Sequence, residues 1–285
     1  MAATYIATAP NGTRYACSTL REARLVESGR TQRSRPRRRR SPVHNPYIDK
    51  IQFPSGNWGY IYSPEDVAKR HAQKAKKIAG LKARYKSLEQ FVRRDVKAGN
   101  PVALAVALIM ETYERPGNSE SAKDGHFGVT GWQCRHLRWQ GGKAIVAYVA
   151  KSGVEQAKTI SDPLLVAALR AQAKGCRPGS KLVPTTAATV NRYLKAFSIS
   201  AKDLRTYGAN TEMQHALASA RRSGPDLAAL KERDRAKALK AEFQAALTRV
   251  AGKLGHTTAV LKKQYLVAGI EPLYLSTGNV LKEFA

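Results

Sequence analysis

One stretch near the beginning of the chain restricts where a packed core can start. Residues 30–42 read RTQRSRPRRRRSP and contain seven arginines and two prolines. Such a run of like charges repels itself and has no apolar face to bury, so it predicts a disordered basic arm or linker. We expect it to contact phosphate groups without sequence preference, through Arg37, Arg38, Arg39 and Arg40. A localisation signal is the alternative, and the sequence does not separate the two.

The arm divides a short N-terminal region, residues 1–62, from a main body, residues 63–285. The pieces TYIATA and TRYAC flank a PNG turn and predict a small hairpin over residues 3–17. Residues 49–62 are again typical of strands. Hydrophobic residues make up 43% of the chain. That content is enough for the main body to form one large domain with a hydrophobic core of its own, which we expect to be the catalytic domain.

Helix signals dominate the main body. Ser63, followed by a proline and then by Asp66, predicts a capped helix start. Apolar residues recur there at helical spacing, at Ile78, Leu81, Tyr85 and Leu88. Further helices are expected over about 101–114, after a capping box at Ser200–Asp203, over about 226–252, and generally from 163 onward.

Between these helical segments, residues 129–160 look like strands. The pieces are VTGWQCRHLRW, AIVAYVA and VEQAKTIS, and the last two are joined by a Lys151-Ser152-Gly153 turn. The fold class expected is therefore mainly α with a small antiparallel β-sheet, an α+β fold preceded by a short β-containing, arginine-rich region.

The charge of the chain points to a polyanionic partner. Lys and Arg number 49 against 21 Asp and Glu, which gives a net charge of +28 and a pI of about 10.3. Neutralising phosphates with such cations releases condensed counterions and favours binding. Lys74 and Lys77 on the first long helix are candidate nucleic-acid contacts. A solvated basic helix face is the plainer alternative.

Several classes of protein are disfavoured. No phosphate-loop motif and no finger-like group of metal ligands is present, so neither a nucleotide nor a metal site is expected. The longest apolar run, VALAVALIM, has nine residues, and the beginning of the chain does not resemble a signal peptide, so no membrane partner is expected. Three cysteines lie far apart without a CxxC pair, which favours reduced thiols and an intracellular protein.

Six residues form an ordered set that suits phosphoryl transfer. They are Arg115 in ERPGN, Lys151 in AKSG, Lys202 and Arg205 in KDLRTY, and His256 and Tyr265 in LGHTTAVLKKQY. A phenol has a pKa of about 10 and attacks a phosphodiester only if charge on the phosphoryl oxygens is stabilised. Two guanidiniums and a histidine suit that role, and a lysine can protonate the leaving oxygen.

Each of these residues has a plainer interpretation. Tyr265 could be a core residue, Arg115 could cap the end of a helix, and Lys151 could be an ordinary hairpin lysine. Arg205 could be a surface charge on its helix, and His256 could be a satisfied or solvated histidine. Lys143, in GGK, is the second candidate for the general acid. The adjacent Lys262 and Lys263 are further candidate DNA contacts.

The four motifs in this order resemble those of type IB DNA topoisomerases of the poxvirus and bacterial kind, and the resemblance covers roughly residues 50–268. It implies a helical catalytic domain in which Tyr265 is the nucleophile. Arg115, Arg205 and His256 would act on the phosphate, and Lys151 would be the general acid supported by Lys202. It also implies a monomer that acts on double-stranded DNA through a 3′-phosphotyrosyl intermediate, without ATP or a metal. Its location would be the nucleoid, the nucleus or a virion.

The chain departs from that family at three places. After Tyr265 it reads LVAGIEP, where bacterial members usually have a short proline-containing segment. Ala150 stands where the family usually has glycine, and only about 60 residues precede the helical part, so the N-terminal DNA clamp is expected to be reduced. A tyrosine recombinase is the first alternative, although recombinases usually have HxxR where this chain has Lys202-Asp-Leu-Arg205. A non-catalytic basic nucleic-acid-binding protein is the second.

Overall fold

The computed structural model describes residues 5–8, 14–17, 49–52 and 58–281. The chain forms two compact units, Met1–Arg70 and His71–Ala285, and their boundary lies within the first long helix. The arginine-rich arm, with Arg37, Arg38, Arg39 and Arg40, lies outside the described residues. The functional division at residues 62 and 63 stays a prediction.

Two hairpins lie in the first unit. Strands β1 (Tyr5–Thr8) and β2 (Arg14–Cys17) pair antiparallel, and so do β3 (Asp49–Gln52) and β4 (Trp58–Ile61). The hairpin predicted around the PNG turn is therefore confirmed, and the second strand-like segment is itself a hairpin. Tyr62 lies just before the first long helix, and the guanidinium of Arg70, within that helix, lies 3.6 Å from the centre of the Tyr62 ring.

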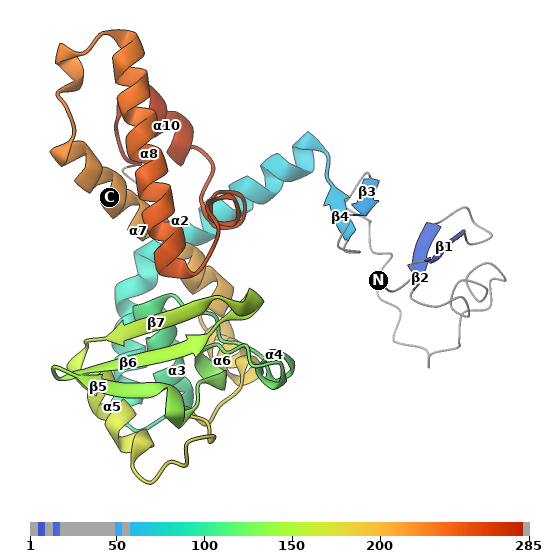
Figure 1. Cartoon of the computed structure of the whole chain (residues 1–285), viewed down its shortest axis with the longest axis vertical. Coiled ribbons are helices and arrows are strands. Elements are labelled where there is room, and N and C mark those ends of the chain that lie inside the picture. Colours follow the sequence, from blue (N-terminus) through green and yellow to red (C-terminus); the bar gives the residue numbers. More distant parts are fainter. Residues whose placement is uncertain (1–4, 9–13, 18–48, 53–57, 282–285) are drawn as a thin grey trace. The chain divides into compact units, whose positions relative to one another are not determined.

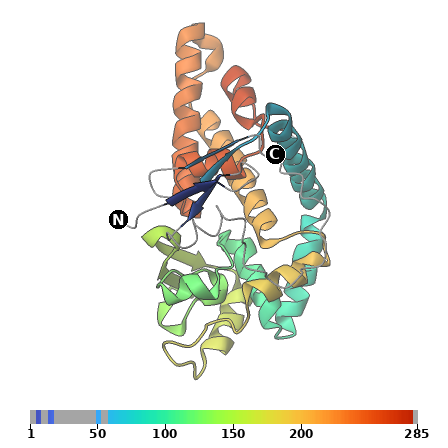
Figure 2. The same ribbon diagram turned by 90° about the vertical axis from the view of Figure 1, so that its right-hand side faces the viewer.

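The second unit is mostly helical (Figure 1). The helices are α2 (Pro64–Lys97), which begins in the first unit, α3 (Pro101–Thr112), α4 (Ser119–Lys123), α5 (Pro163–Ala173), α6 (Ala187–Lys195), α7 (Ala201–Ser223), α8 (Glu232–Leu254), α9 (Thr258–Val260) and α10 (Ile270–Thr277). A π-helical turn, η5 (Leu261–Tyr265), follows α9. α8 and α10 lie side by side (Figures 1 and 2). Among the described residues, no helix is long and apolar enough to cross a membrane.

Local capping explains where two of these helices begin. The Asp66 amide donates to Ser63 Oγ at 3.0 Å, and the Ser200 amide donates to Asp203 Oδ2 at 2.8 Å. Both contacts satisfy amides that a helix start leaves without a partner. Both starts agree with the sequence prediction.

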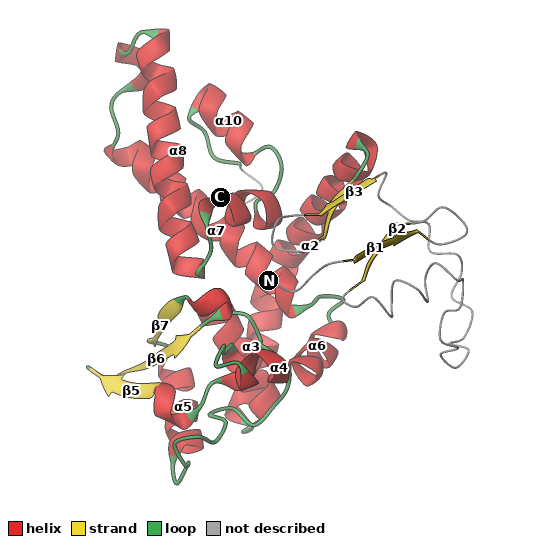
Figure 3. Cartoon of the chain, turned by 45° about the vertical axis from the view of Figure 1, so that its right-hand side comes forward, coloured by secondary structure: helices red, strands yellow, loops and turns green. Residues whose placement is uncertain are grey.

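The sheet contains three antiparallel strands in the order β5 (Leu137–Gln140), β6 (Lys143–Val149) and β7 (Glu155–Ile160) (Figure 3). α3 packs against β7, and α5 packs against β6. This arrangement confirms the α+β class, mainly helical with a small antiparallel sheet.

One strand prediction was wrong. Residues 129–136 form two short 3-10 turns, Val129–Gly131 and Cys134–His136. Of the predicted strand VTGWQCRHLRW, only the part from Leu137 onward enters the sheet. Val129 and Trp132 are fully buried. Their backbone is fixed by the loop after α3, since Val129 donates to the Arg115 carbonyl at 2.9 Å. β-branched and aromatic residues are buried here although the segment is not a strand. Composition alone does not distinguish a buried strand from a buried irregular segment.

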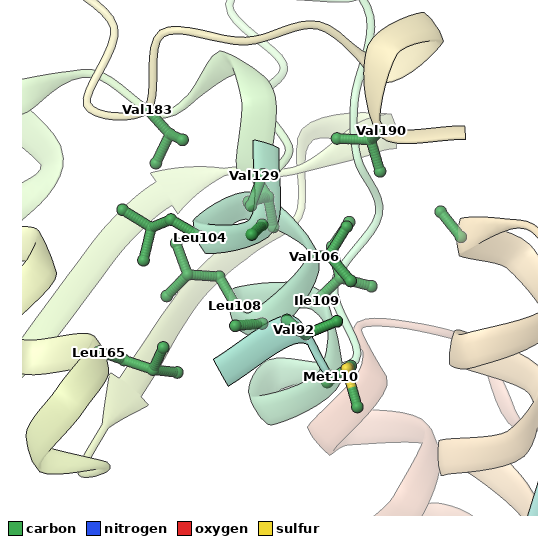
Figure 4. Packing of buried hydrophobic residues seen from close by; sticks show 14 of the residues in the cluster. Val92, Leu104, Val106, Leu108, Ile109, Met110, Val129, Leu165, Val183 and Val190 are labelled. Atoms are coloured by element: carbon green, nitrogen blue, oxygen red, sulfur yellow. The ribbon is translucent and has the colours of Figure 1, made fainter. Parts of the chain in front are cut away.

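The core lies around α3, which is buried along nearly its whole length. Figure 4 shows Leu104, Val106, Leu108 and Ile109 from this helix packed with Val92 of α2. A second apolar cluster joins α7, α8 and the segment after α9, and it includes Tyr265. α7 contacts both α3 and α8, so it connects the two clusters beside the candidate site.

The prediction of reduced thiols was wrong for two of the three cysteines. Cys134 and Cys176 form a disulfide, although their sequence separation is 42. Backbone hydrogen bonds bring the two segments together: the Cys134 amide donates to the Ser180 carbonyl at 3.0 Å, and the Arg135 amide donates to the Pro178 carbonyl at 2.9 Å. The cysteines therefore no longer argue for an intracellular location.

Candidate active site

A pocket of about 620 Å³ brings together five of the six residues singled out in the sequence: Arg115, Lys151, Lys202, Arg205 and Tyr265. They come from the loop after α3, the β6–β7 turn, the first turns of α7 and the end of η5. His256 contacts three of them directly. The rest of the pocket is lined by Pro116, Gly117, Asn118, Ser121, His126, Phe127, Asn191, Ser200 and Ala201.

The loop that carries Arg115 is held by a close backbone contact. Gly117 has φ +81°, a conformation that favours glycine. A Cβ atom on Gly128 would lie 2.6 Å from both the Arg115 carbonyl oxygen and the Gly117 nitrogen. The two loop segments can therefore meet only because Gly128 has no side chain. The RPGN sequence thus serves to fix the direction of Arg115 as well as to supply it.

Arg205 is buried, with only 3% of its surface exposed, and its guanidinium is oriented by several partners. Nη1 donates to Glu114 Oε1 at 3.0 Å, and Nη2 donates to the Leu254 carbonyl at the C-terminal end of α8. Nε and Nη2 both approach His256 Nε2, at 3.2 and 2.8 Å. A cation is favoured at this helix end because the helix dipole is negative there.

His256 lies between the two arginines. It follows Gly255, which ends α8 in the left-handed conformation. Its Nδ1 lies 3.3 Å from Arg115 Nη2, on the side away from Arg205. Burial, and after it the charges of Arg205 and Arg115, lower the pKa of His256 to about 3. The ring is therefore neutral at neutral pH.

A neutral imidazole has one N–H and one acceptor nitrogen. Two donor groups of Arg205 approach Nε2, so we assign the acceptor to Nε2 and the proton to Nδ1. In this tautomer the Nδ1–H faces the Arg115 guanidinium, donor against donor. An anionic oxygen that approached both nitrogens from the pocket could accept from both. The pair therefore offers two donors to an anion.

Tyr265 ends the π-helical turn and is 8% exposed. Its ring stacks on the His256 ring, with centroids 4.6 Å apart and an angle of 29° between the planes. The guanidinium carbon of Arg205 lies 5.7 Å from the Tyr265 ring centre. The nine-residue spacing in LGHTTAVLKKQY therefore allows His256 and Tyr265 to meet face to face.

The main chain around Tyr265 is held by two residues whose part in the site was not predicted. The fully buried Asn210 donates to the Tyr265 carbonyl at 3.0 Å and accepts from the Val267 amide at 2.8 Å. Lys74 Nζ lies 3.2 Å from the carbonyls of both Gln264 and Leu266. Burial, with a smaller effect of the charge of Lys202, lowers the pKa of Lys74. No spacing in the sequence reveals these long-range contacts.

Lys151, and not Lys143, reaches the pocket. Lys151 is exposed in a 3-10 turn, Lys151–Gly153, between β6 and β7. Lys143 begins β6 and so lies at the opposite end of that strand. Lys202 is exposed at the rim of the pocket, one turn before Arg205 on α7.

Most of the lysines predicted to contact DNA have partners within the protein. Besides Lys74, Lys77 pairs with Asp203 at 2.8 Å and Lys262 pairs with Glu271 at 2.6 Å. The side chains of Lys77 and Lys262 keep 48% and 50% of their surface exposed, and Lys263 is exposed as well. DNA contacts by these lysines stay a prediction.

The comparison with protein families decides between the interpretations of this site. The family described as eukaryotic DNA topoisomerase I, catalytic core, matches residues 66–271, which is most of the chain and includes all four motifs. The chain belongs to this family. It is therefore a type IB DNA topoisomerase, an isomerase whose substrate is DNA, and its location is DNA-associated. The recombinase and the passive nucleic-acid-binding protein are set aside.

A search of curated proteins gives no match for this topoisomerase. The finer resemblance to poxvirus and bacterial members therefore stays an interpretation of the motifs. Within the described residues, no group of three or more His, Cys, Asp or Glu side chains could hold a metal ion. The charged groups that the pocket offers to a phosphate are the side chains of Arg115, Lys151, Lys202 and Arg205.

Proposed function

We propose that this topoisomerase relaxes supercoiled double-stranded DNA by transient cleavage of one strand, with Tyr265 as the nucleophile. One observation carries the proposal. The Tyr265 ring is stacked on a neutral histidine whose two ring nitrogens contact Arg115 and Arg205. A tyrosine in the core of an ordinary helical domain has no need of two guanidiniums and a histidine at its ring.

The chemical step follows from the roles that these groups can perform. The Tyr265 oxygen attacks phosphorus and loses its proton to water, while the bond from phosphorus to the 5′ oxygen breaks. Arg115, Arg205 and the His256 N–H stabilise charge on the non-bridging oxygens. The Lys151 ammonium gives its proton to the departing 5′ oxygen, with Lys202 supporting this transfer. The product is a 3′-phosphotyrosyl enzyme and a free 5′ hydroxyl.

Strand rejoining is the reverse of cleavage. While the strand is open, the duplex swivels about the intact strand and loses supercoils. The 5′ hydroxyl then attacks the phosphotyrosyl bond, which has kept the energy of the broken diester. The reaction therefore needs neither ATP nor an obligatory metal ion, because the side chains of this chain supply the charge and the proton.

The remaining chain is proposed to support DNA binding. Residues 63–285 would carry catalysis, and the arm at residues 30–42 would hold the enzyme on DNA through phosphate contacts. The enzyme would act as a monomer within an intracellular DNA-containing compartment. Removing the arm should weaken DNA binding and make it less dependent on salt concentration.

The proposal is tested by incubating the wild type and Tyr265→Phe with negatively supercoiled plasmid, in EDTA and without ATP. We expect relaxation by the wild type and none by the variant. Relaxation by both would refute Tyr265 as the nucleophile, and relaxation only with added metal would refute the metal-free mechanism. A 5′-labelled duplex should give a covalent protein–DNA band with the wild type alone.

A further inference from the structure

We infer that Glu114 is a positioning residue that fixes both arginines of the cleavage pocket through one carboxylate oxygen. The inference rests on the proposed function, since it assigns a role in that same reaction. Glu114 directly precedes Arg115 in the loop after α3, and it is not among the six residues that the sequence singled out. Its side chain is 3% exposed. A buried carboxylate is costly unless all of its lone pairs are used.

The partners of Glu114 link the two arginines. Oε1 accepts from the backbone amide of Arg115 at 2.7 Å and from Arg205 Nη1 at 3.0 Å. Oε2 accepts from the Tyr148 hydroxyl at 2.6 Å and lies 3.7 Å from Lys158 Nζ. One oxygen therefore sets the distance between the main chain of one arginine and the guanidinium of the other.

This contact leaves Arg205 with one defined direction for a phosphate. A guanidinium has five N–H groups in a rigid fork. Glu114 takes one from Nη1, the Leu254 carbonyl takes one from Nη2, and His256 faces the Nε and Nη2 groups. The second N–H of Nη1 is the donor that remains for a phosphoryl oxygen. Without Glu114, the Nη1 end of the fork loses its anchor.

Lys158 adds a second buried cation to the cluster around Glu114. Its side chain is 8% exposed, and its ammonium donates to the Lys253 carbonyl at 2.6 Å. Two cations, Lys158 and Arg205, thus lie beside the single carboxylate of Glu114. The excess positive charge attracts a phosphate to this region, while Glu114 offsets part of the repulsion between the two cations.

The competing explanation is that Glu114 only stabilises the fold as part of a buried ion pair. The two explanations predict different cleavage rates for a variant in which the net charge of the buried cluster is restored. Glu114→Gln leaves two unopposed buried cations, whereas Glu114→Gln with Lys158→Met removes one charge of each sign. A purely structural role predicts that the double variant regains both its melting temperature and its cleavage rate. A positioning role predicts that the melting temperature recovers and the rate does not.

The experiment measures single-turnover cleavage at saturating enzyme, DNA affinity and melting temperature for full-length wild type, Glu114→Gln, the double variant and Glu111→Gln. Glu111 is an exposed carboxylate in the last turn of α3, three residues before Glu114, and serves as the matched control. We expect both Glu114 variants to cleave about 10- to 100-fold more slowly, which is less than the about 10²–10³-fold lost with a direct transition-state donor, because Glu114 acts through the arginines. DNA affinity should change by less than about threefold, and Glu111→Gln should match the wild type.

A second substrate separates positioning from general damage. In a methylphosphonate linkage, a methyl group replaces one non-bridging oxygen and the scissile group is uncharged. The demand for aligned guanidiniums is then smaller, so the deficit of the Glu114 variants should shrink to less than about threefold. A structural defect would slow both substrates equally.

The outcomes are distinct. An unchanged rate in Glu114→Gln, a recovered rate in the double variant, or an equal deficit on both substrates overturns the inference. If both variants fail to fold, Tyr148→Phe decides, because it keeps every charge and removes one bond that orients the carboxylate. An unchanged cleavage rate in that variant also overturns the inference. Failure of the proposed function looks different, since the wild type would then form no covalent adduct with either substrate.

Discussion

His256 and Tyr265 lie ring against ring, 4.6 Å apart between centroids. The histidine is also the point at which the two pocket arginines meet, because Arg115 approaches Nδ1 and Arg205 approaches Nε2. One neutral ring therefore places the tyrosine and orders the cations around the site where a phosphate would bind. The following predictions test this arrangement and the contacts that support it.

Replacing His256 should separate its hydrogen bond from its stacking contact. We expect His256→Ala to slow single-turnover cleavage about 10²-fold, since one donor to the transition-state charge is lost. His256→Asn keeps an N–H donor and should retain a larger share of the rate. Quench-flow measurement of the covalent adduct distinguishes the two. Equal rates in both variants would contradict a donor role for this residue.

The lowered pKa of His256 has a consequence for stability. The pKa is about 3 in the folded protein and about 6.5 in a free side chain, so the unfolded chain binds one more proton between these values. The contribution of this group to the free energy of unfolding is complete above about pH 6.5 and is lost as the pH falls toward 3. His256→Asn should therefore lose less stability than the wild type between pH 7 and pH 4.5. Urea unfolding at the two pH values measures the difference. A loss as large as that of the wild type would show that His256 is not held neutral.

Lys74 should matter for the placement of the tyrosine rather than for DNA affinity. Its ammonium bridges the carbonyls on either side of Tyr265, so Lys74→Met should free that turn and lower the cleavage rate about tenfold. Lys76→Met removes the same charge from an exposed position of α2 and is the matched control. Filter binding and single-turnover cleavage would be compared for both. Equal effects of the two variants on both measurements would reduce Lys74 to an ordinary surface cation.

The general acid can be identified by the leaving group. Lys151→Ala should slow cleavage of an ordinary duplex by 10²-fold or more, in the range of about 10²–10⁴ for a lost general acid. A substrate with sulfur in place of the 5′ oxygen releases a thiolate, which needs no proton, and should restore the rate of this variant. Arg205→Ala should not be restored, and Lys143→Ala should behave as wild type on both substrates. If instead Lys143→Ala were slow on the ordinary duplex and regained its cleavage rate on the sulfur substrate, Lys143 and not Lys151 would be the general acid.

The disulfide should stabilise the loop that follows α5. Closing a loop between cysteines with a sequence separation of 42 is worth about 4 kcal/mol in the chain-entropy description. Cys176→Ser, or reduction of the wild type, should therefore lower the melting temperature. Cys17→Ser controls for the loss of a thiol. A melting temperature that does not respond to reductant would show that the bond is absent in solution.

Local signals in the sequence determined the beginnings of the helices and the order of the site residues. The caps at Ser63 and Ser200 involve side chains within three residues of the amides they bind, so their chemistry is readable directly. The turn that carries Lys151 is similarly local. The motif order then predicted which residues would meet, because the proposed chemistry needs two arginines, a histidine and a tyrosine at one phosphate.

The tertiary structure alone decided what holds those residues in place. Glu114 is an ordinary acid in the sequence, and it becomes a bridge only when α3 and α7 pack together. Asn210 and Lys74 reach the Tyr265 turn across 55 and about 190 residues of chain. The pairing of Cys134 with Cys176 and the non-strand course of residues 129–136 have the same origin. Such contacts depend on how distant elements pack, and burial then gives a polar side chain a single set of partners that no local pattern encodes.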